Sequence, residues 1–153
     1  MPQANTSSID AVLPYTGRML LLDELRDHGP DHVTCGVTVH DQAMFCESGQ
    51  GVPAWVGLEY MAQTCCAFSG LEDLLEGRKP SIGLLLGSRA YESEVEFFPV
   101  GAELTIRAEL VLRDESDLVA FVCVIHDREQ ILARGDVKAY RPKDVLAVIR
   151  GSR

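Results

Sequence analysis

The sequence predicts an α+β fold in which an antiparallel sheet wraps around one long buried helix. Segment 51–69 is mostly apolar or small and contains one charged residue, Glu59. It is long enough for a helix of about four turns. Two alternating segments precede it and four follow it, each with the period of a strand. A helix that is apolar on every side must be covered on every side, so we expect the strands to form a sheet around it.

The elements expected before the helix are short. They are a disordered start at 1–8, a helix from Ser8 to Leu13, strands at 19–25 and 31–40 around a turn, and an irregular loop at 41–51. Ser8 is a residue type that caps helices, and Pro14 would end this one.

The elements expected after residue 69 are mainly strands. They are an amphipathic helical extension at 71–76, strands at 81–91, 102–113, 118–126 and 130–140, and a short amphipathic tail from Pro142. Strand 102–113 alternates clearly, with Leu104, Ile106, Ala108, Leu110 and Leu112 on one face. We expect a single domain over residues 1–153, because a chain of this length can bury one substantial core.

Composition excludes several classes of function. The formal net charge of -9 makes nucleic acid an unsuitable partner. No secretory leader and no apolar stretch long enough to span a membrane is found, which predicts a cytoplasmic protein. The five cysteines are odd in number and lack the spacing of a zinc site, so we expect them to be reduced and structural, with no metal bound.

Glu59 is the residue that most needs an explanation. An unpaired carboxylate in an apolar helix is costly, so it must be neutralised, hydrogen-bonded or used in chemistry. A cap or an arginine partner would satisfy it as well as a catalytic role would. The residue types alone leave both interpretations open.

Three segments resemble a known family. Residues 52–63, VPAWVGLEYMAQ, are similar to the helix motif MPG…E.MAQ of hotdog-fold 3-hydroxyacyl-(acyl-carrier-protein) dehydratases. Residues 13–23, LPYTGRMLLLD, resemble the opening LPHR…LL.D of that family, and 99–104, PVGAEL, resemble its PGD.L turn. Within this group the chain is most similar to predicted dehydratases of aryl-polyene pathways. The resemblance implies a hotdog fold and an acyl thioester substrate carried by acyl carrier protein, with no metal or redox cofactor.

The resemblance also implies roles for single residues. Glu59 would work opposite a histidine from the other subunit of a dimer, across an acyl-phosphopantetheine tunnel. The amides of Ala54 and Trp55 would bind the thioester carbonyl at the positive end of the helix. Gln63 would orient Glu59 or satisfy backbone groups. Arg89 would guide the phosphopantetheine or the acidic carrier, unless it is a plain surface arginine.

The histidine of the family motif, GHFPG, is missing from this chain. Counting back from Glu59 without gaps places Phe45 at its position, and a shifted count places Glu47 or Ser48 there. The nearest histidine is His40, which ends a predicted strand and is also a plausible surface residue. The acid that would complement Glu59 is therefore His40, Ser48 or a group from another chain.

Several functions follow from these features. The first is a 3-hydroxyacyl-(acyl-carrier-protein) dehydratase of fatty-acid or aryl-polyene biosynthesis. The second is a hotdog thioesterase in which Glu59 acts without a histidine. The third is an incomplete subunit, or an acyl-binding module, that pairs with a histidine-bearing hotdog chain. We accordingly expect a homodimer or a heterodimer that interacts with acyl carrier protein.

Overall fold

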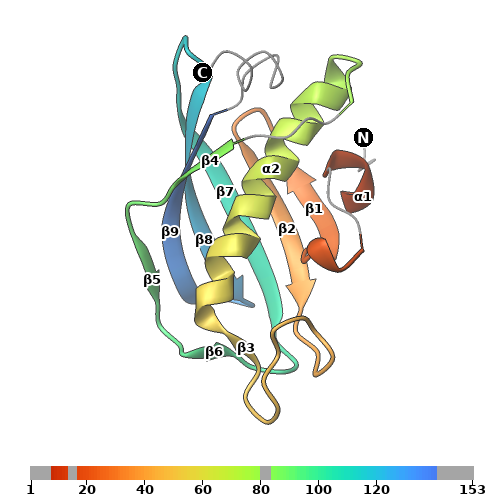
Figure 1. The fold of residues 1–153 in the computed structure, drawn as a ribbon, viewed down its shortest axis with the longest axis vertical. Helices are drawn as coiled ribbons and strands as arrows, with labels where there is room; N and C mark the ends of the chain where they lie inside the picture. The colour runs from red at the N-terminus through yellow and green to blue at the C-terminus, as the bar shows by residue number, and fades with distance from the viewer. Residues whose placement is uncertain (1–7, 14–16, 80–83, 141–153) are drawn as a thin grey trace, which may run out of the picture.

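The computed structural model describes residues 8–13, 17–79 and 84–140, and they form a curved sheet around one long helix (Figure 1). The strands are β1 (Glu24–His28), β2 (His32–Thr38), β3 (Val52–Pro53), β4 (Leu84–Gly87), β5 (Tyr91–Ser93), β6 (Phe97–Phe98), β7 (Glu103–Arg113), β8 (Leu118–Asp127) and β9 (Gln130–Tyr140). The helical segments are α1 (Ile9–Val12), η1 (Gly17–Met19), η2 (Ala54–Val56) and α2 (Gly57–Leu75).

The described strands pair antiparallel in the order β1-β2-β7-β8-β9-β4, and β5 also pairs with β9. A separate short pair joins β3 to β6. Figure 1 shows α2 running across the concave side of the larger sheet. The predicted α+β fold, an antiparallel sheet around one long helix, is confirmed.

The core lies between α2 and the inward face of the long strands. Alternation along the strands produces this face, whose buried members include Val33, Cys35, Leu104, Ile106, Ala108, Phe121, Cys123 and Ile125. Phe68 of α2 contacts Phe121 of β8 edge-on, with ring centroids 5.4 Å apart. Along these strands buried residues alternate with more exposed ones, as the apolar–polar alternation of the sequence predicts.

The beginning of α2 is fitted closely to the sheet. Val52 and Pro53 pair with β6, a 3-10 turn follows, and the helix proper starts at Gly57. A Cβ atom at Gly57 would collide with the Tyr91 hydroxyl and would lie 3.0 Å from the Phe98 ring. Glycine is therefore required here by a close approach of helix and sheet.

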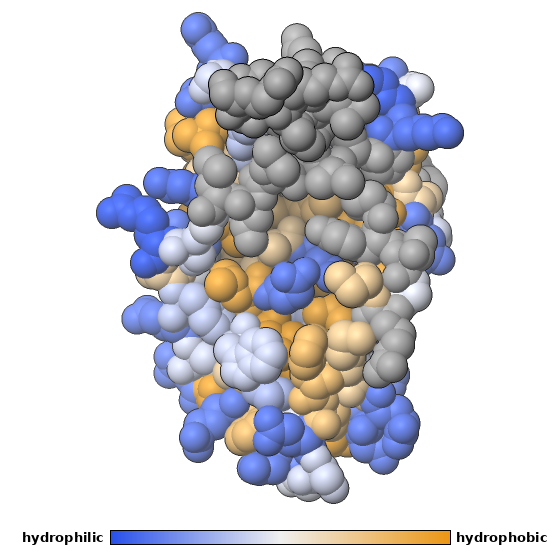
Figure 2. All heavy atoms as spheres, viewed as in Figure 1, coloured by the Kyte–Doolittle hydropathy of each residue, from blue (hydrophilic) through white to orange (hydrophobic). Residues whose placement is uncertain are grey.

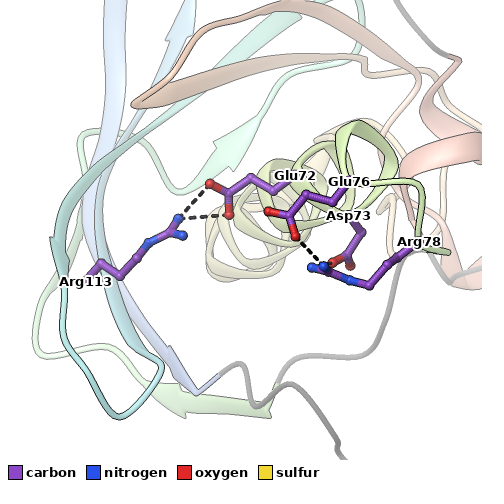
Figure 3. A network of polar contacts seen from close by, with 5 residues as sticks. All are labelled: Glu72, Asp73, Glu76, Arg78 and Arg113. Atoms are coloured by element: carbon purple, nitrogen blue, oxygen red, sulfur yellow. Dashed lines mark hydrogen bonds and ion pairs between the residues drawn. The ribbon is translucent and has the colours of Figure 1, made fainter.

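The end of α2 is held by ion pairs (Figure 3). Arg113 of β7 reaches the Glu72 carboxylate with two contacts of 2.9 Å. Arg78 pairs with the buried Asp73 at 2.8 Å and also with Glu76. Gly77 has a φ of 75° and ends the helix, with the Arg78 N–H donating to the Asp73 carbonyl at 2.8 Å. The start of α2 is therefore held by its packing against the sheet. Its end is held by these ion pairs and by the backbone hydrogen bond of its last turn.

Some predicted elements differ in extent. The first strand begins at Glu24 rather than 19, because Met19–Leu21 contact α2 instead of pairing. Segment 81–91 contributes two strands, β4 and β5, separated by a bend. Leu112 is exposed, since a register shift follows Leu110.

Other predictions fall at the edges of the described residues. Ser8 precedes α1 but its side chain makes no capping hydrogen bond. Residues 1–7, Pro14 and the tail from Pro142 lie outside the described residues. In the part of the chain that the structure describes, no helix is long and apolar enough to cross a membrane.

Candidate active site

A groove with a volume of about 250 Å³ lies beside the start of α2, and Glu59 forms part of its wall. The other wall residues are Met19, Leu21, Met44, Phe45, Trp55, Val56 and Gln63. They come from the segment before β1, the loop before β3 and the helix itself. Among the described residues of this wall, Glu59 alone has an ionisable side chain, so the site offers a carboxylate beside apolar side chains. We call it the Glu59 groove.

Glu59 is exposed in this chain, which corrects the expectation that its own chain buries it. The sheet covers one side of α2 and leaves the side that carries Glu59 open. Among the described residues, the Glu59 side chain contacts neither a backbone cap nor an arginine; it accepts a hydrogen bond from Gln63. Because an exposed carboxylate is solvated and needs no buried partner, a catalytic role for Glu59 stays a prediction.

Gln63 is buried, and every polar atom of its amide is used. Its Nε2 donates to Glu59 Oε2 at 3.1 Å and to the Met19 carbonyl at 2.8 Å, and its Oε1 accepts from the Leu21 N–H at 3.0 Å. Gln63 therefore orients the Glu59 carboxylate and satisfies backbone groups of the segment that forms one edge of the groove. The predicted contact with Glu59 is present, and the backbone groups that Gln63 satisfies belong to its own chain rather than to a dimer interface.

Phe45 and Trp55 form the opposite edge. Their rings meet edge-on with centroids 5.4 Å apart, and their side chains remain 47% and 63% exposed. Phe45 has a φ of 70°, a conformation that costs a bulky residue energy and is often found at functional sites. Trp55 is thus a surface residue of the groove rather than a core residue, and Phe45 lines the same groove as Glu59.

Some backbone polar groups at the start of the helix already have hydrogen-bond partners within the chain. The Ala54 N–H donates to the Glu96 carbonyl at 2.9 Å, and the Ala54 carbonyl accepts from the Tyr91 hydroxyl at 2.5 Å. Burial raises the pKa of Tyr91 to about 12, so this hydroxyl stays a donor. The amide predicted at Ala54 is therefore occupied by the Glu96 carbonyl. Substrate binding by either residue stays a prediction.

The proposed acids do not lie in the groove. His40 follows β2, is exposed, and lines a neighbouring cavity instead. Ser48 is exposed in a tight turn closed by the hydrogen bonds between Glu47 and Gly51. Neither residue belongs to the wall that contains Glu59. A catalytic role for either would require a movement or a second chain.

Arg89 also lies apart from Glu59. It is exposed in the bend between β4 and β5, where its N–H donates to Asp136 at 3.0 Å, and it lines a shallow hollow with Arg134. Arg78 is paired with the carboxylates of Asp73 and Glu76 near the other end of α2. The structure does not gather these cations around the groove.

Some groove residues were not singled out by the sequence. Met19, Leu21 and Met44 belong to loops whose position depends on contacts with α2. One signal was available: residues 19–22 are a continuous apolar run between Arg18 and Asp23, whereas a half-buried strand alternates apolar with polar residues.

The cysteines lie in or near the core. Cys65 of α2 and Cys123 of β8 have their sulfur atoms 3.7 Å apart without a disulfide. Burial raises the pKa of Cys65 and raises that of Cys35 to about 12, which disfavours reactive thiolates. Among the described residues, no group of His, Cys, Asp or Glu side chains is arranged to hold a metal ion.

The groove opens onto an apolar face. Figure 2, seen from the side on which α2 lies, shows hydrophobic residues gathered over the middle of this face. Met19, Phe45 and Trp55 at the groove are among the large apolar side chains most exposed in the chain. Exposed apolar surface of this kind marks an interaction site.

Comparison with known proteins places this geometry in a family. The family model described as ApeP-like, ApeP dehydratase, matches residues 7–150. A chain of the dehydratase heterocomplex ApeI:P from Xenorhabdus doucetiae is 28% identical, with a TM-score of 0.87, over 97% of this chain and 100% of that chain. No curated protein matches the sequence significantly.

More distant solved structures support the fold alone. The virulence protein Cj0977 from Campylobacter jejuni is 11% identical, with a TM-score of 0.63 over 89% of both chains. The PaaI protein of the Escherichia coli phenylacetic acid degradation operon is 14% identical, with a TM-score of 0.57 over 76% of this chain and 81% of that one. The resemblance to hotdog dehydratases of aryl-polyene pathways is confirmed, and the chain belongs to the ApeP-like dehydratases.

Proposed function

We propose that this chain is the carboxylate-bearing subunit of a two-chain hotdog dehydratase that acts on 3-hydroxyacyl thioesters of acyl carrier protein. The observation that carries the proposal is the composition of the Glu59 groove. Among the described residues its wall has one carboxylate and no histidine, and the GHFPG motif that supplies the family's histidine is missing from the sequence. The site is half of an acid–base pair.

The exposed face supports an association with a second chain. A carboxylate that works in catalysis needs surroundings from which water is excluded, and this chain alone leaves Glu59 exposed. A hotdog partner packed against Met19, Phe45 and Trp55 would close the groove and bring its own histidine. The similar ApeI:P structure is a dehydratase heterocomplex, which is consistent with this arrangement.

The chemistry requires two groups. One takes the proton from C2 of the acyl chain, and the other protonates the C3 hydroxyl, which leaves as water while the C2–C3 double bond forms. Glu59 and the partner's histidine divide these tasks. The Trp55 amide at the helix start would polarise the thioester carbonyl and stabilise the charge that develops on it. Gln63 keeps the Glu59 carboxylate in one orientation.

A thioesterase is the second candidate. The wall of the groove holds a carboxylate without a histidine, and such a carboxylate can act alone as a nucleophile or general base on a thioester. The two candidates differ in product, because hydrolysis releases a free thiol and dehydration an enoyl thioester.

The test is turnover of a 3-hydroxyacyl thioester of acyl carrier protein, with enoyl product and free thiol followed together. The chain is assayed alone and with a histidine-bearing hotdog protein encoded in its gene neighbourhood. We expect enoyl product only from the pair, and a loss of at least about a hundredfold in Glu59→Gln. Glu109→Gln, which changes an exposed carboxylate on β7, is the matched control and should retain activity.

Each other outcome has a definite meaning. Enoyl product from the chain alone would show that it carries its own acid and would overturn the two-chain proposal. Free thiol that depends on Glu59 would establish the thioesterase. Failure to associate with any hotdog partner, together with no turnover, would favour an acyl-binding module.

A further inference from the structure

A second cavity, of about 210 Å³, adjoins the Glu59 groove and has no role in the proposed reaction. Leu21 and Met44 belong to the walls of both cavities, so only these side chains need to move for one ligand to reach both. The walls differ in character, because the second cavity is partly polar. We call it the Tyr60 pocket.

Tyr60 is the unusual member of this wall. It is 3% exposed, its ring packs against Phe98 with centroids 5.9 Å apart, and its carbonyl accepts from Thr64. Its hydroxyl has no hydrogen-bond partner among the described residues. A buried hydroxyl without a partner is costly and rare in folded proteins. Since Tyr60 lines a cavity, water or a polar group of a ligand that displaces it can supply this partner.

The rest of the wall complements this hydroxyl. Asp23 accepts the Thr38 N–H through Oδ2 at 2.7 Å, which leaves its Oδ1 available to accept from a ligand. Burial and the nearby Asp23 charge raise the pKa of Tyr60, so the phenol remains a donor. His40 lines the same pocket. The pocket therefore offers a donor and an acceptor beside apolar side chains.

We propose that the Tyr60 pocket is a binding subsite for an amide or hydroxyl group on the chain that occupies the Glu59 groove. The inference rests on the proposed function, which identifies that chain as an acyl thioester. Such a substrate can supply the group from two sources: an amide of the pantetheine arm, or a hydroxyl at the far end of the acyl chain. Either one accepts a hydrogen bond from Tyr60 and donates one to Asp23.

The test uses three inert thioethers as probes: S-octyl-pantetheine, its analogue with a hydroxyl at the end of the octyl chain, and S-octyl-N-acetylcysteamine. Affinities are measured by calorimetry on the assembly in which the chain is purified. Tyr60→Phe should weaken binding about tenfold for the probes whose polar group reaches the pocket. Loss confined to the hydroxyl-ended probe identifies the acyl end. Loss for all three probes identifies the arm amide nearest the sulfur, and loss for both pantetheine probes but not for S-octyl-N-acetylcysteamine identifies the distal amide of the arm.

The Tm of the variants distinguishes a ligand-binding role of Tyr60 from a structural role. Because the Tyr60 hydroxyl makes no bond within the described residues, Tyr60→Phe should leave the Tm unchanged or raise it. Tyr91→Phe, which removes a hydroxyl that is bonded to Ala54, should lower the Tm. Asp23→Asn keeps an oxygen for the Thr38 N–H and should weaken the same probes as Tyr60→Phe does.

Two results would overturn the subsite. One is a failure of the binding experiment: either no probe binds, or Tyr60→Phe and Asp23→Asn bind every probe with unchanged affinity. The other is a fall in Tm for Tyr60→Phe as large as for Tyr91→Phe. Because the probes do not react, the answer is independent of dehydration. If the turnover assay gives enoyl product but Tyr60→Phe leaves the affinity for every probe unchanged, only the subsite is rejected. If Tyr60→Phe weakens probe binding but no enoyl product forms, only the proposed function is rejected.

Discussion

The Gln63 side chain contributes both to the stability of the fold and to the geometry of the candidate site. Its amide satisfies two backbone groups of the segment Met19–Leu21 and also holds the Glu59 carboxylate. Gln63→Met keeps the apolar volume but leaves those backbone groups without their partner, so we expect the free energy of unfolding to fall by about 2–4 kcal/mol. Urea unfolding measures it. Gln50→Met, in an exposed turn, is the control and should change stability by less than about 0.5 kcal/mol. An equal loss in both variants would contradict the role of the Gln63 amide.

The start of α2 is where helix and sheet are fitted most closely. Gly57→Ala gains helix propensity of about 1 kcal/mol. Its new Cβ, however, meets the Tyr91 hydroxyl and lies 3.1 Å from Ile125 Cδ1. We expect a net destabilisation of about 1–3 kcal/mol by thermal or urea unfolding. Tyr91→Phe removes the hydroxyl that the Cβ meets, so the double variant should lose less than the sum of the single variants. Additive losses would show that the collision is not with Tyr91.

The strands show which elements the sequence can predict. β7, β8 and β9 match their predicted ranges closely, because alternation over ten or eleven residues specifies both the strand and its inward face. The strand predicted at 81–91 divides, since Asp136 accepts the N–H groups of Arg89 and Ala90 and bends the chain there. A carboxylate that lies far away in the sequence leaves no local signal at the bend.

The whole chain exposes a face that the sequence predicts to be buried. An apolar helix predicts burial, but the sequence does not show whether the helix's own chain or a partner chain covers it. Here the sheet covers α2 on one side, and Glu59 and Trp55 remain exposed on the other. The motif around Glu59 lies at a groove, as a site would, and its catalytic role stays a prediction. In the proposed dehydratase a second chain covers the exposed side of the helix.

Trp55 provides a test of that surface. It is 63% exposed at the groove, and a large aromatic residue in such a position is the type that dominates binding energy at interfaces. Trp55→Ala should weaken the complex with the hotdog partner at least about thirtyfold, which corresponds to about 2 kcal/mol. Leu75→Ala, at the opposite end of α2 and 82% exposed, should leave the affinity nearly unchanged. Titration calorimetry or light scattering measures both. Equal effects of the two substitutions would place the interface elsewhere and would leave Glu59 facing solvent, which the proposed dehydratase does not allow.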